Sequence, residues 1–333
     1  MKTKAVQLAR LTLPYARLEL GDAWGRYALA FPDDPPEWND EGADEPDDRP
    51  WILRVVGDSL EATRLSLPAG QLVTAATFVE DGALLLATCS EQDGAPHLAR
   101  HHPSRDGAWH LEPQPEPLSF AGELGARLTA APGLGCVAWL AAETGEDGHM
   151  ALARIDDSLR ADVVHTLPDP YRGGSQIAEL WADPTGVGPV ADAGQHGRWA
   201  WWFRDAGEQL HLEATRTLSE WPFAWLSGGQ PLEAKGREPH SGRAHLWPPW
   251  ARQLPLGFEP AEVLVGARAS WIQPLEGTSL VNVSHAEGET SEVELDGREL
   301  GADEEVGLVA WGDRLLTCTE ADRGSECVLW TAP

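Results

Sequence analysis

Apolar and polar residues alternate in short runs along most of the chain, and this two-residue period is typical of half-buried β-strands. Lys4–Leu13 is one such run, and Trp51–Val56 is another. Turn residues such as glycine, proline, aspartate and serine separate the runs, and long runs with the 3.6-residue period of a helix are missing. The pattern therefore predicts an all-β chain of short strands and tight turns.

One stretch of this pattern recurs along the chain. Trp51–Pro68 reads as two strands joined by a turn at Gly57–Ser59, and it ends in Leu-Ser-Leu-Pro. Asp156–Pro168 repeats the second half of this stretch with one inserted residue, and Leu212–Leu218 repeats its Leu-Glu-Ala-Thr-Arg segment. Recurrence of this kind predicts a repeat architecture.

The predicted strands group into units of four, each about 40–55 residues long, which is typical of β-propeller blades. The last unit has three strands, whereas Lys4–Leu13 stands alone at the N-terminus. Pairing Lys4–Leu13 with the final strand, Glu326–Thr331, would complete the last unit and leave no exposed sheet edge. This pairing would also bury Leu8, Leu11 and Leu13.

The organisation resembles β-propellers of the WD40-like kind over nearly the whole chain, although no Gly-His and Trp-Asp signature, kelch Gly-Gly pair or Asp-box identifies a particular family. The resemblance implies one domain, residues 1–333, folded as a seven-bladed β-propeller of four-stranded antiparallel blades closed by the N-terminal strand. Because the units differ in length, six or eight blades are the alternatives. The expected blades are residues 15–68, 69–117, 118–168, 169–220, 221–258, 259–300, and 301–333 joined by 1–14.

The chain is strongly acidic, since 53 acidic residues against 25 basic ones give a formal net charge of −28. Residues 33–48 alone hold nine acidic residues and no basic one, which predicts a solvated acidic loop inserted in the first blade. Such a surface repels phosphate backbones and anionic lipids, so neither nucleic acid nor a membrane is an expected partner. No glycine-rich phosphate loop occurs, and no cofactor is expected.

The N-terminal segment lacks the apolar core of a signal peptide, because Gln7 and Arg10 interrupt it. The longest uncharged apolar run, Leu128–Ala142, is too short to span a bilayer. We therefore expect a soluble, cytoplasmic protein. The four cysteines include no Cys-x-x-Cys pair, as expected in a reducing compartment. Cys318 and Cys327 flank a predicted hairpin, across which they can face each other.

Gly57-Asp58-Ser59-Leu60 follows an apolar strand and resembles the nucleophile block of the GDSL hydrolases. In that family the serine begins a catalytic triad that an Asp-x-x-His block completes, and Asp162 and His165 have this spacing. The Gly-x-Asn-Asp block of the family is missing, however. The matching segment Asp156–Leu159 indicates a recurring hairpin turn, in which Gly, Asp and Ser are favoured for backbone reasons. We therefore interpret Ser59 as a turn residue.

Four histidines lie close together in the sequence, namely His97, His101, His102 and His110. A zinc site requires three or four converging ligands. Adjacent residues of a strand point to opposite faces, so His101 and His102 would not converge. We expect exposed or singly hydrogen-bonded histidines, and neither this group nor the acidic loop predicts a metal site.

Tryptophan is unusually frequent, with 16 in the chain and eight of them between residues 181 and 250. Within Arg198–Arg204, Trp199 and Trp201 share one face of a predicted strand and Trp202 lies on the other. These flat side chains can pack between blades, or they can form an exposed site together with nearby basic residues. The candidate partner-binding residues are Arg198, Trp199, Trp201, Arg204, Lys235, Arg237, His240 and Arg243.

The loops between the second and third strands of each unit should gather on one face of a propeller. Several of them are acidic, at residues 33–48, Glu91, Asp93, Glu143, Glu146, Asp147, Glu320 and Asp322. By contrast, Gly194–Gly197 carries no acidic residue and Lys235–Arg243 is net basic. An acidic crescent with one basic sector would suit an electrostatically steered protein interface.

Together these features predict a non-catalytic protein-binding or scaffold propeller, a subunit or regulator of an intracellular bacterial-type assembly, with a protein as its partner. Whether it also takes a small ligand is left open. One alternative is a propeller enzyme, a hydrolase or lyase with its site in the central channel. The other is a carbohydrate-binding module that uses the tryptophans. Several polar residues converging in the channel would favour the enzyme.

Overall fold

The fold was analysed in a computed structural model. It describes residues 3–4, 7–22, 24–33, 49–67, 70–90, 96–104, 107–112, 126–131, 133–142, 149–169, 175–183, 185–192, 198–207, 209–218, 223–225, 231–235, 243–246, 253–255, 262–265, 269–274, 280–285, 290–294, 306–311, 314–321 and 324–331.

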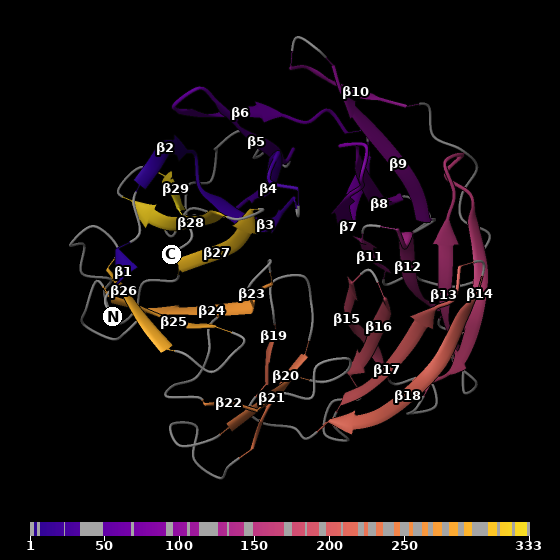
Figure 1. The fold of residues 1–333 in the computed structure, drawn as a ribbon. Coiled ribbons are helices and arrows are strands. Elements are labelled where there is room, and N and C mark those ends of the chain that lie inside the picture. The colour runs from indigo at the N-terminus through magenta and orange to yellow at the C-terminus, as the bar shows by residue number, and fades with distance from the viewer. Residues whose placement is uncertain are drawn as a thin grey trace, which may run out of the picture.

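The regular elements of these residues are all β-strands, and they form seven sheets that follow one another around a common centre (Figure 1). The first sheet has β3 (Ala16–Gly21), β4 (Tyr27–Pro32), β5 (Trp51–Val56) and β6 (Ser59–Arg64). The second has β7 (Gln71–Phe78), β8 (Leu84–Ser90), β9 (Pro96–Pro103) and β10 (Trp109–Leu111). The third has β11 (Ala126–Ala131), β12 (Gly135–Ala142), β13 (His149–Ile155) and β14 (Ala161–Pro168). The fourth has β15 (Gln176–Asp183), β16 (Gly186–Asp192), β17 (Arg198–Asp205) and β18 (Leu210–Leu218).

The remaining three sheets lie in the C-terminal part of the chain. The fifth has β19 (Phe223–Trp225), β20 (Pro231–Lys235), β21 (Arg243–Leu246) and β22 (Gln253–Pro255). The sixth has β23 (Glu262–Val265), β24 (Ala269–Pro274), β25 (Leu280–His285) and β26 (Thr290–Glu294), with β1 (Thr3–Lys4) as a fifth strand. The seventh has β27 (Val306–Trp311), β28 (Arg314–Ala321) and β29 (Gly324–Thr331), with β2 (Gln7–Leu13). The expected all-β architecture of four-stranded antiparallel sheets is confirmed.

The two chain ends meet as the missing strand indicated, with one correction. β2 pairs antiparallel with β29, and Leu11 lies opposite Cys327. Lys4 does not belong to the same strand, because β1 pairs in parallel with β26 of the sixth sheet. The N-terminal segment therefore adds a strand to the sixth sheet first and then completes the seventh.

Leu8 was expected in the core, and this was wrong. The register of β2 shifts between Gln7 and Ala9, so Leu8 is an extra residue at a β-bulge and is 40% exposed. Beyond the bulge the alternation brings Ala9 and Leu13 to the buried face. Leu11 packs against the same core cluster.

The core lies between neighbouring sheets and so covers both faces of a strand. On β17, Trp201 and Phe203 pack with residues of the third sheet, whereas Trp202 and Ala200 pack in a separate cluster on the opposite face. Strands that are buried on both faces read as continuous apolar runs, as in Leu84–Ala87 of β8. In the described part of the chain, no helix is long and apolar enough to cross a membrane.

The recurring Gly-Asp-Ser-Leu and Asp-Asp-Ser-Leu segments lie at hairpin turns, as interpreted, with the correction that Ser59 is the first residue of β6 and not part of the turn itself. Val56 pairs with Ser59, which leaves Gly57 and Asp58 as a two-residue turn. Gly57 has a φ of +61°, which suits glycine at the first position of a tight hairpin turn. The second segment forms the longer turn between β13 and β14, where Ile155 pairs with Ala161.

Candidate functional site

The second half of the third strand carries an arginine in each of the first four sheets, at Arg54, Arg100, Arg154 and Arg204. Each of the first three reaches the turn between the third and fourth strands of the next sheet. The Arg54 guanidinium lies against Gly107, where an added Cβ would clash with Nη1 unless the arginine moved. Arg100 donates to the Asp157 carbonyl at 3.2 Å, and Arg154 pairs with Asp205 at 2.5 Å. These arginines tie consecutive sheets together at one end of the fold.

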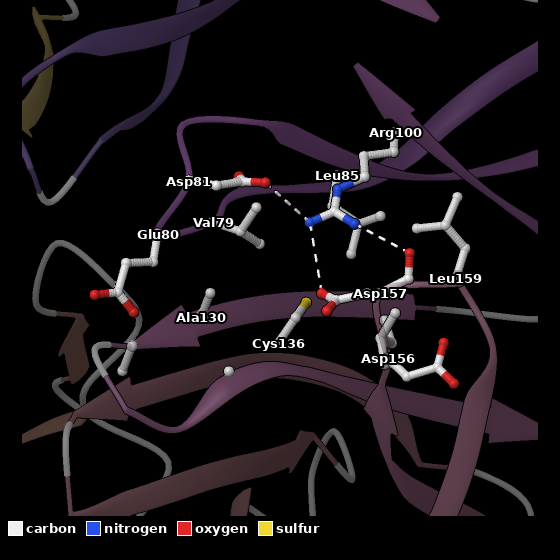
Figure 2. A pocket seen from close by; sticks show the side chains of 13 residues that line it. Val79, Glu80, Asp81, Leu85, Arg100, Ala130, Cys136, Asp156, Asp157 and Leu159 are labelled. Carbon is white, nitrogen blue, oxygen red and sulfur yellow. Dashed lines mark hydrogen bonds and ion pairs between the residues drawn. The ribbon is translucent and has the colours of Figure 1, made fainter. Parts of the chain in front are cut away.

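The contact made by Arg100 crosses a pocket of about 270 Å³ between the second and third sheets (Figure 2). The turn between β7 and β8, Arg100 of β9 and the turn between β13 and β14 surround it. Its guanidinium donates to the Asp81 carboxylate at 3.2 Å and lies 3.9 Å from that of Asp157. The Arg100 side chain is 13% exposed, so the pocket holds a largely buried cation in a fixed place.

The pocket has an apolar floor and an acidic rim. Apolar side chains from both sheets form the floor, namely Val79, Leu85, Ala130, Ile155 and Leu159. Four acidic residues, Glu80, Asp81, Asp156 and Asp157, line the rim, and the carboxylates of Asp81 and Asp157 point toward Arg100 (Figure 2). Four carboxylates and the one guanidinium of Arg100 leave this lining with a net charge of −3. An apolar stem that ends in a positive charge is the chemical group that this arrangement complements.

Hydrogen bonds fix both acidic turns of the rim. The Asp156 carboxylate accepts from the Ser158 hydroxyl at 2.7 Å and the Arg160 backbone N–H at 3.0 Å. The bonds from Ser158 and Arg160 hold the pKa of Asp156 below its usual value, so this carboxylate is charged at neutral pH. On the other turn, Arg26 donates to the carbonyls of Val79 and Glu80 at 3.1 and 2.9 Å.

Leu159 and Cys136 complete the inner wall of the pocket. Leu159 has a φ of +64°, which is uncommon for a residue with a side chain, and yet that side chain is buried in the floor. Burial raises the pKa of the Cys136 thiol to about 12, although the charge of Arg100 opposes this shift. The thiol is therefore protonated at neutral pH and is a poor nucleophile. The wall can bind a ligand but does not present an activated sulfur.

The described members of the predicted partner-binding set lie elsewhere, on β17, β20 and β21. Trp201 is only 6% exposed and Trp199 packs against the same core cluster, so both tryptophans contribute to packing between sheets. Arg204 is exposed and holds Glu213 through Nε at 3.1 Å and Nη2 at 2.8 Å.

The backbone pairs Lys235 with Arg243 across β20 and β21. Arg198 lies opposite Asp192 in the register of β16 and β17. Arg237 and His240 lie outside the described residues, as do Glu91, Asp93, Glu143, Glu146, Asp147, Asp322, Gly194–Gly197 and residues 34–48.

The three residues of the hydrolase interpretation are not brought together. Ser59 is exposed on β6 of the first sheet, whereas Asp162 and His165 lie on β14 of the third. The second sheet lies between them (Figure 1). His165 hydrogen-bonds the Leu210 carbonyl and packs on Phe203, with 4.7 Å between ring centroids. Asp162 pairs with Arg160 at 3.2 Å.

The histidines of the second sheet do not converge either. His102 bonds Glu112 at 2.9 Å and His110 is exposed, as expected for exposed or singly bonded side chains. His101 differs, because it is 1% exposed and neither ring nitrogen has a hydrogen-bond partner. Burial, with a smaller effect from His102, lowers the pKa of His101 to about 4. No group of three potential metal ligands occurs among the residues that the structure describes.

The pocket residues were missed in the sequence, although a signal for the arginine was present. The signal is an arginine that follows two apolar residues in the second half of a third strand, at Arg54, Arg100, Arg154 and Arg204. Aligning the units by their third strands would have found this repeat. Asp81 and Asp157 carry no comparable signal, because turns are commonly acidic.

No family model matches the chain, and no curated protein matches it in sequence. Solved structures match in fold at low identity. The β-propeller domain of the Trilobed protease from Pyrococcus furiosus has a TM-score of 0.54 at 11% identity, and the match covers 95% of both chains. A prolyl endopeptidase has a TM-score of 0.56 at 13% identity, and the match covers 97% of this chain and 48% of the other.

A chain of the mitotic checkpoint complex has a TM-score of 0.50 at 9% identity, and the match covers 99% of this chain and 96% of the other. At these identities the matches show the fold alone. Together with the radial arrangement of four-stranded antiparallel sheets, they show that this chain has a β-propeller fold.

Proposed function

We propose that the protein is a non-catalytic binding propeller, with residues 1–333 forming one domain of seven blades. In this proposal the seven sheets are the blades, and β2 closes the ring by completing the seventh. Packing supports this arrangement, because one core cluster contains residues of β2, β28, β29 and the first sheet. A compact ring presents the pockets between its blades at fixed positions, which suits a scaffold.

The acidic pocket between the second and third sheets carries the proposal. Its acidic rim, net charge of −3 and apolar floor complement a lysine or arginine side chain of a protein partner. Its volume of about 270 Å³ lies just below the range of pockets for drug-sized ligands, so a single side chain fits better than a large cofactor. The partner is thus expected to insert a basic residue there.

Peptides that carry one, two or three lysine or arginine residues would test this site by fluorescence anisotropy. Asp157→Lys is expected to raise Kd about tenfold or more, which corresponds to about 1.4 kcal/mol. Asp58→Lys is the matched control, because Asp58 is an exposed acid in the equivalent turn of the first sheet. Equal weakening in the control would mean that the peptides respond only to overall charge, and the pocket assignment would be abandoned.

A second partner surface is proposed around Arg198, Trp199, Trp201, Arg204, Lys235, Arg237, His240 and Arg243. Because Trp199 and Trp201 pack in the core, the basic residues would make the contacts, and Arg204 is the exposed member whose side chain is described. Acidic peptides should bind this surface, and the double variant Arg237→Glu, Arg243→Glu should weaken the binding of these peptides alone.

The alternative of a propeller hydrolase would gain support if a fluorophosphonate probe labelled Ser59.

A further inference from the structure

Two buried cysteines face each other in the seventh sheet. Cys318 of β28 and Cys327 of β29 are direct cross-strand partners, and their Sγ atoms are 3.2 Å apart. Both are free thiols and are 4% and 0% exposed. The sequence predicted that they can face each other across this hairpin, and the register confirms it. Two thiols in van der Waals contact can form a covalent bond with only a small displacement.

The hydrogen bonds around the pair give the two sulfurs different roles. The Cys318 Sγ–H donates to the Ala16 carbonyl at 3.4 Å, so the Cys327 thiol is the donor in the contact between the two sulfurs. This bond from Cys327, together with one from Ser325, lowers the pKa of Cys318 despite its burial. The same bond to Cys318, with burial, raises the pKa of Cys327. Cys318 is therefore the sulfur that ionises first.

We propose that Cys318 and Cys327 form a reversible dithiol–disulfide couple with hydrogen peroxide as the oxidant. The Cys318 thiolate attacks a peroxide oxygen, the O–O bond breaks, and hydroxide leaves while the sulfur becomes a sulfenic acid. The Cys327 sulfur then attacks the Cys318 sulfur, so that the S–S bond forms and the S–O bond breaks. The two thiol protons convert the two hydroxides to water. The protein loses two electrons and the peroxide gains them.

The position of the pair links its redox state to the chain ends. Cys327 lies between Cys318 on one side and Leu11 of the N-terminal strand on the other. Ala16, the first residue of β3, accepts from Cys318 and donates its N–H to the Ser325 hydroxyl at 2.8 Å. Disulfide formation removes the Cys318 proton and hence its bond to Ala16. Oxidation therefore exchanges one contact with the first sheet for a covalent link within the seventh.

Tryptic digestion distinguishes the two states in the full-length native chain. Cleavage after Arg314 and Arg323 places Cys318 and Cys327 on separate peptides, residues 315–323 and 324–333. The concentration of hydrogen peroxide is increased stepwise until the first of the four cysteines reacts. The remaining thiols are then alkylated with N-ethylmaleimide, and the digest is analysed by mass spectrometry without reductant. The expected product is one species that joins the two peptides and that dithiothreitol separates. First reaction at Cys89 or Cys136 would overturn the proposal.

Serine variants provide the controls. Cys318→Ser and Cys327→Ser should each abolish the linked species, and Cys136→Ser should retain it. The melting temperature of the wild-type chain should rise on oxidation and return to its starting value on reduction. That of Cys136→Ser should respond in the same way, because this variant keeps both cysteines of the pair. Linkage of either cysteine to Cys89 or Cys136 in the native chain would contradict the couple. If the single variants do not fold, the wild-type and Cys136→Ser chains alone decide the question.

Discussion

At the residue scale, the chemistry of individual side chains depends on how far each is removed from water. His101 and His102 are adjacent in β9, and one is buried without a partner while the other bonds Glu112. Cys136 and Cys318 are both buried, yet burial raises the pKa of the first while a hydrogen bond from Cys327 lowers that of the second. Local environment, and not residue type, sets these protonation states.

Stability should depend on pH through His101. Its pKa is about 4 in the folded protein and 6.5 when unfolded, so between these values the unfolded chain binds a proton that the folded chain does not. The free energy of unfolding should thus fall as the pH drops from 6.5 toward 4, by up to about 3 kcal/mol. Above pH 6.5 this residue should have no such effect.

Urea denaturation of His101→Leu at pH 7.5 and pH 4.5 measures this effect. The variant lacks the buried imidazole, so its stability relative to the wild type should increase as the pH falls. His110→Leu is the control, since His110 is an exposed histidine of the same sheet. A constant difference between His101→Leu and the wild type at both pH values would show that His101 does not titrate as described.

At the scale of elements, three of the four third-strand arginines, Arg54, Arg100 and Arg154, contact the next sheet, and among the described residues Arg204 does not. Arg154 and Asp205 are 24% and 13% exposed, whereas Arg204 and Glu213 are 62% and 44% exposed and lie within one sheet. Each pair joins an arginine to a carboxylate, and each arginine is the penultimate residue of a third strand. The two pairs differ in burial and in whether they cross between sheets.

Arg154→Met should destabilise the protein by about 1–3 kcal/mol, because it leaves the largely buried Asp205 carboxylate without its cation. Arg204→Met should cost less than about 1 kcal/mol, as for other exposed ion pairs. Denaturant midpoints with unchanged m-values would measure both effects. Equal losses for the two variants would mean that the link between sheets adds nothing beyond the exposed pair.

At the scale of the whole molecule, strands near the two chain ends share one sheet, because β2 pairs with β29. Deleting residues 1–13 should leave β29 as an open edge and remove Ala9 and Leu13 from the core. The expected cost is several kcal/mol, since burying one leucine is worth about 1.5–3 kcal/mol. Deleting residues 1–6 removes β1 and keeps β2, so the melting temperature should change much less. Similar melting of both truncations and the full chain would rule out closure by β2.

The sequence determined the features of this protein that arise within a hairpin or along one strand. Alternation of side chains and the turn residues specified the strands, and Cys318 and Cys327 could be paired because one hairpin sets their register. The strand missing from the last unit likewise indicated that the N-terminal strand would pair there. These are short-range properties, or a match between one free strand and one vacant edge.

Only the tertiary structure decided which residues meet across sheets. Arg100, Asp81 and Asp157 form one site because two sheets pack side by side, and nothing in their spacing along the chain specifies that contact. The same holds for Trp201, whose period-2 position allows either burial or exposure until the neighbouring sheet covers it. It also holds for Leu8, which a one-residue bulge turns out of the core. Alternation assigns a side chain to a face, and packing against the next sheet determines what that face contacts.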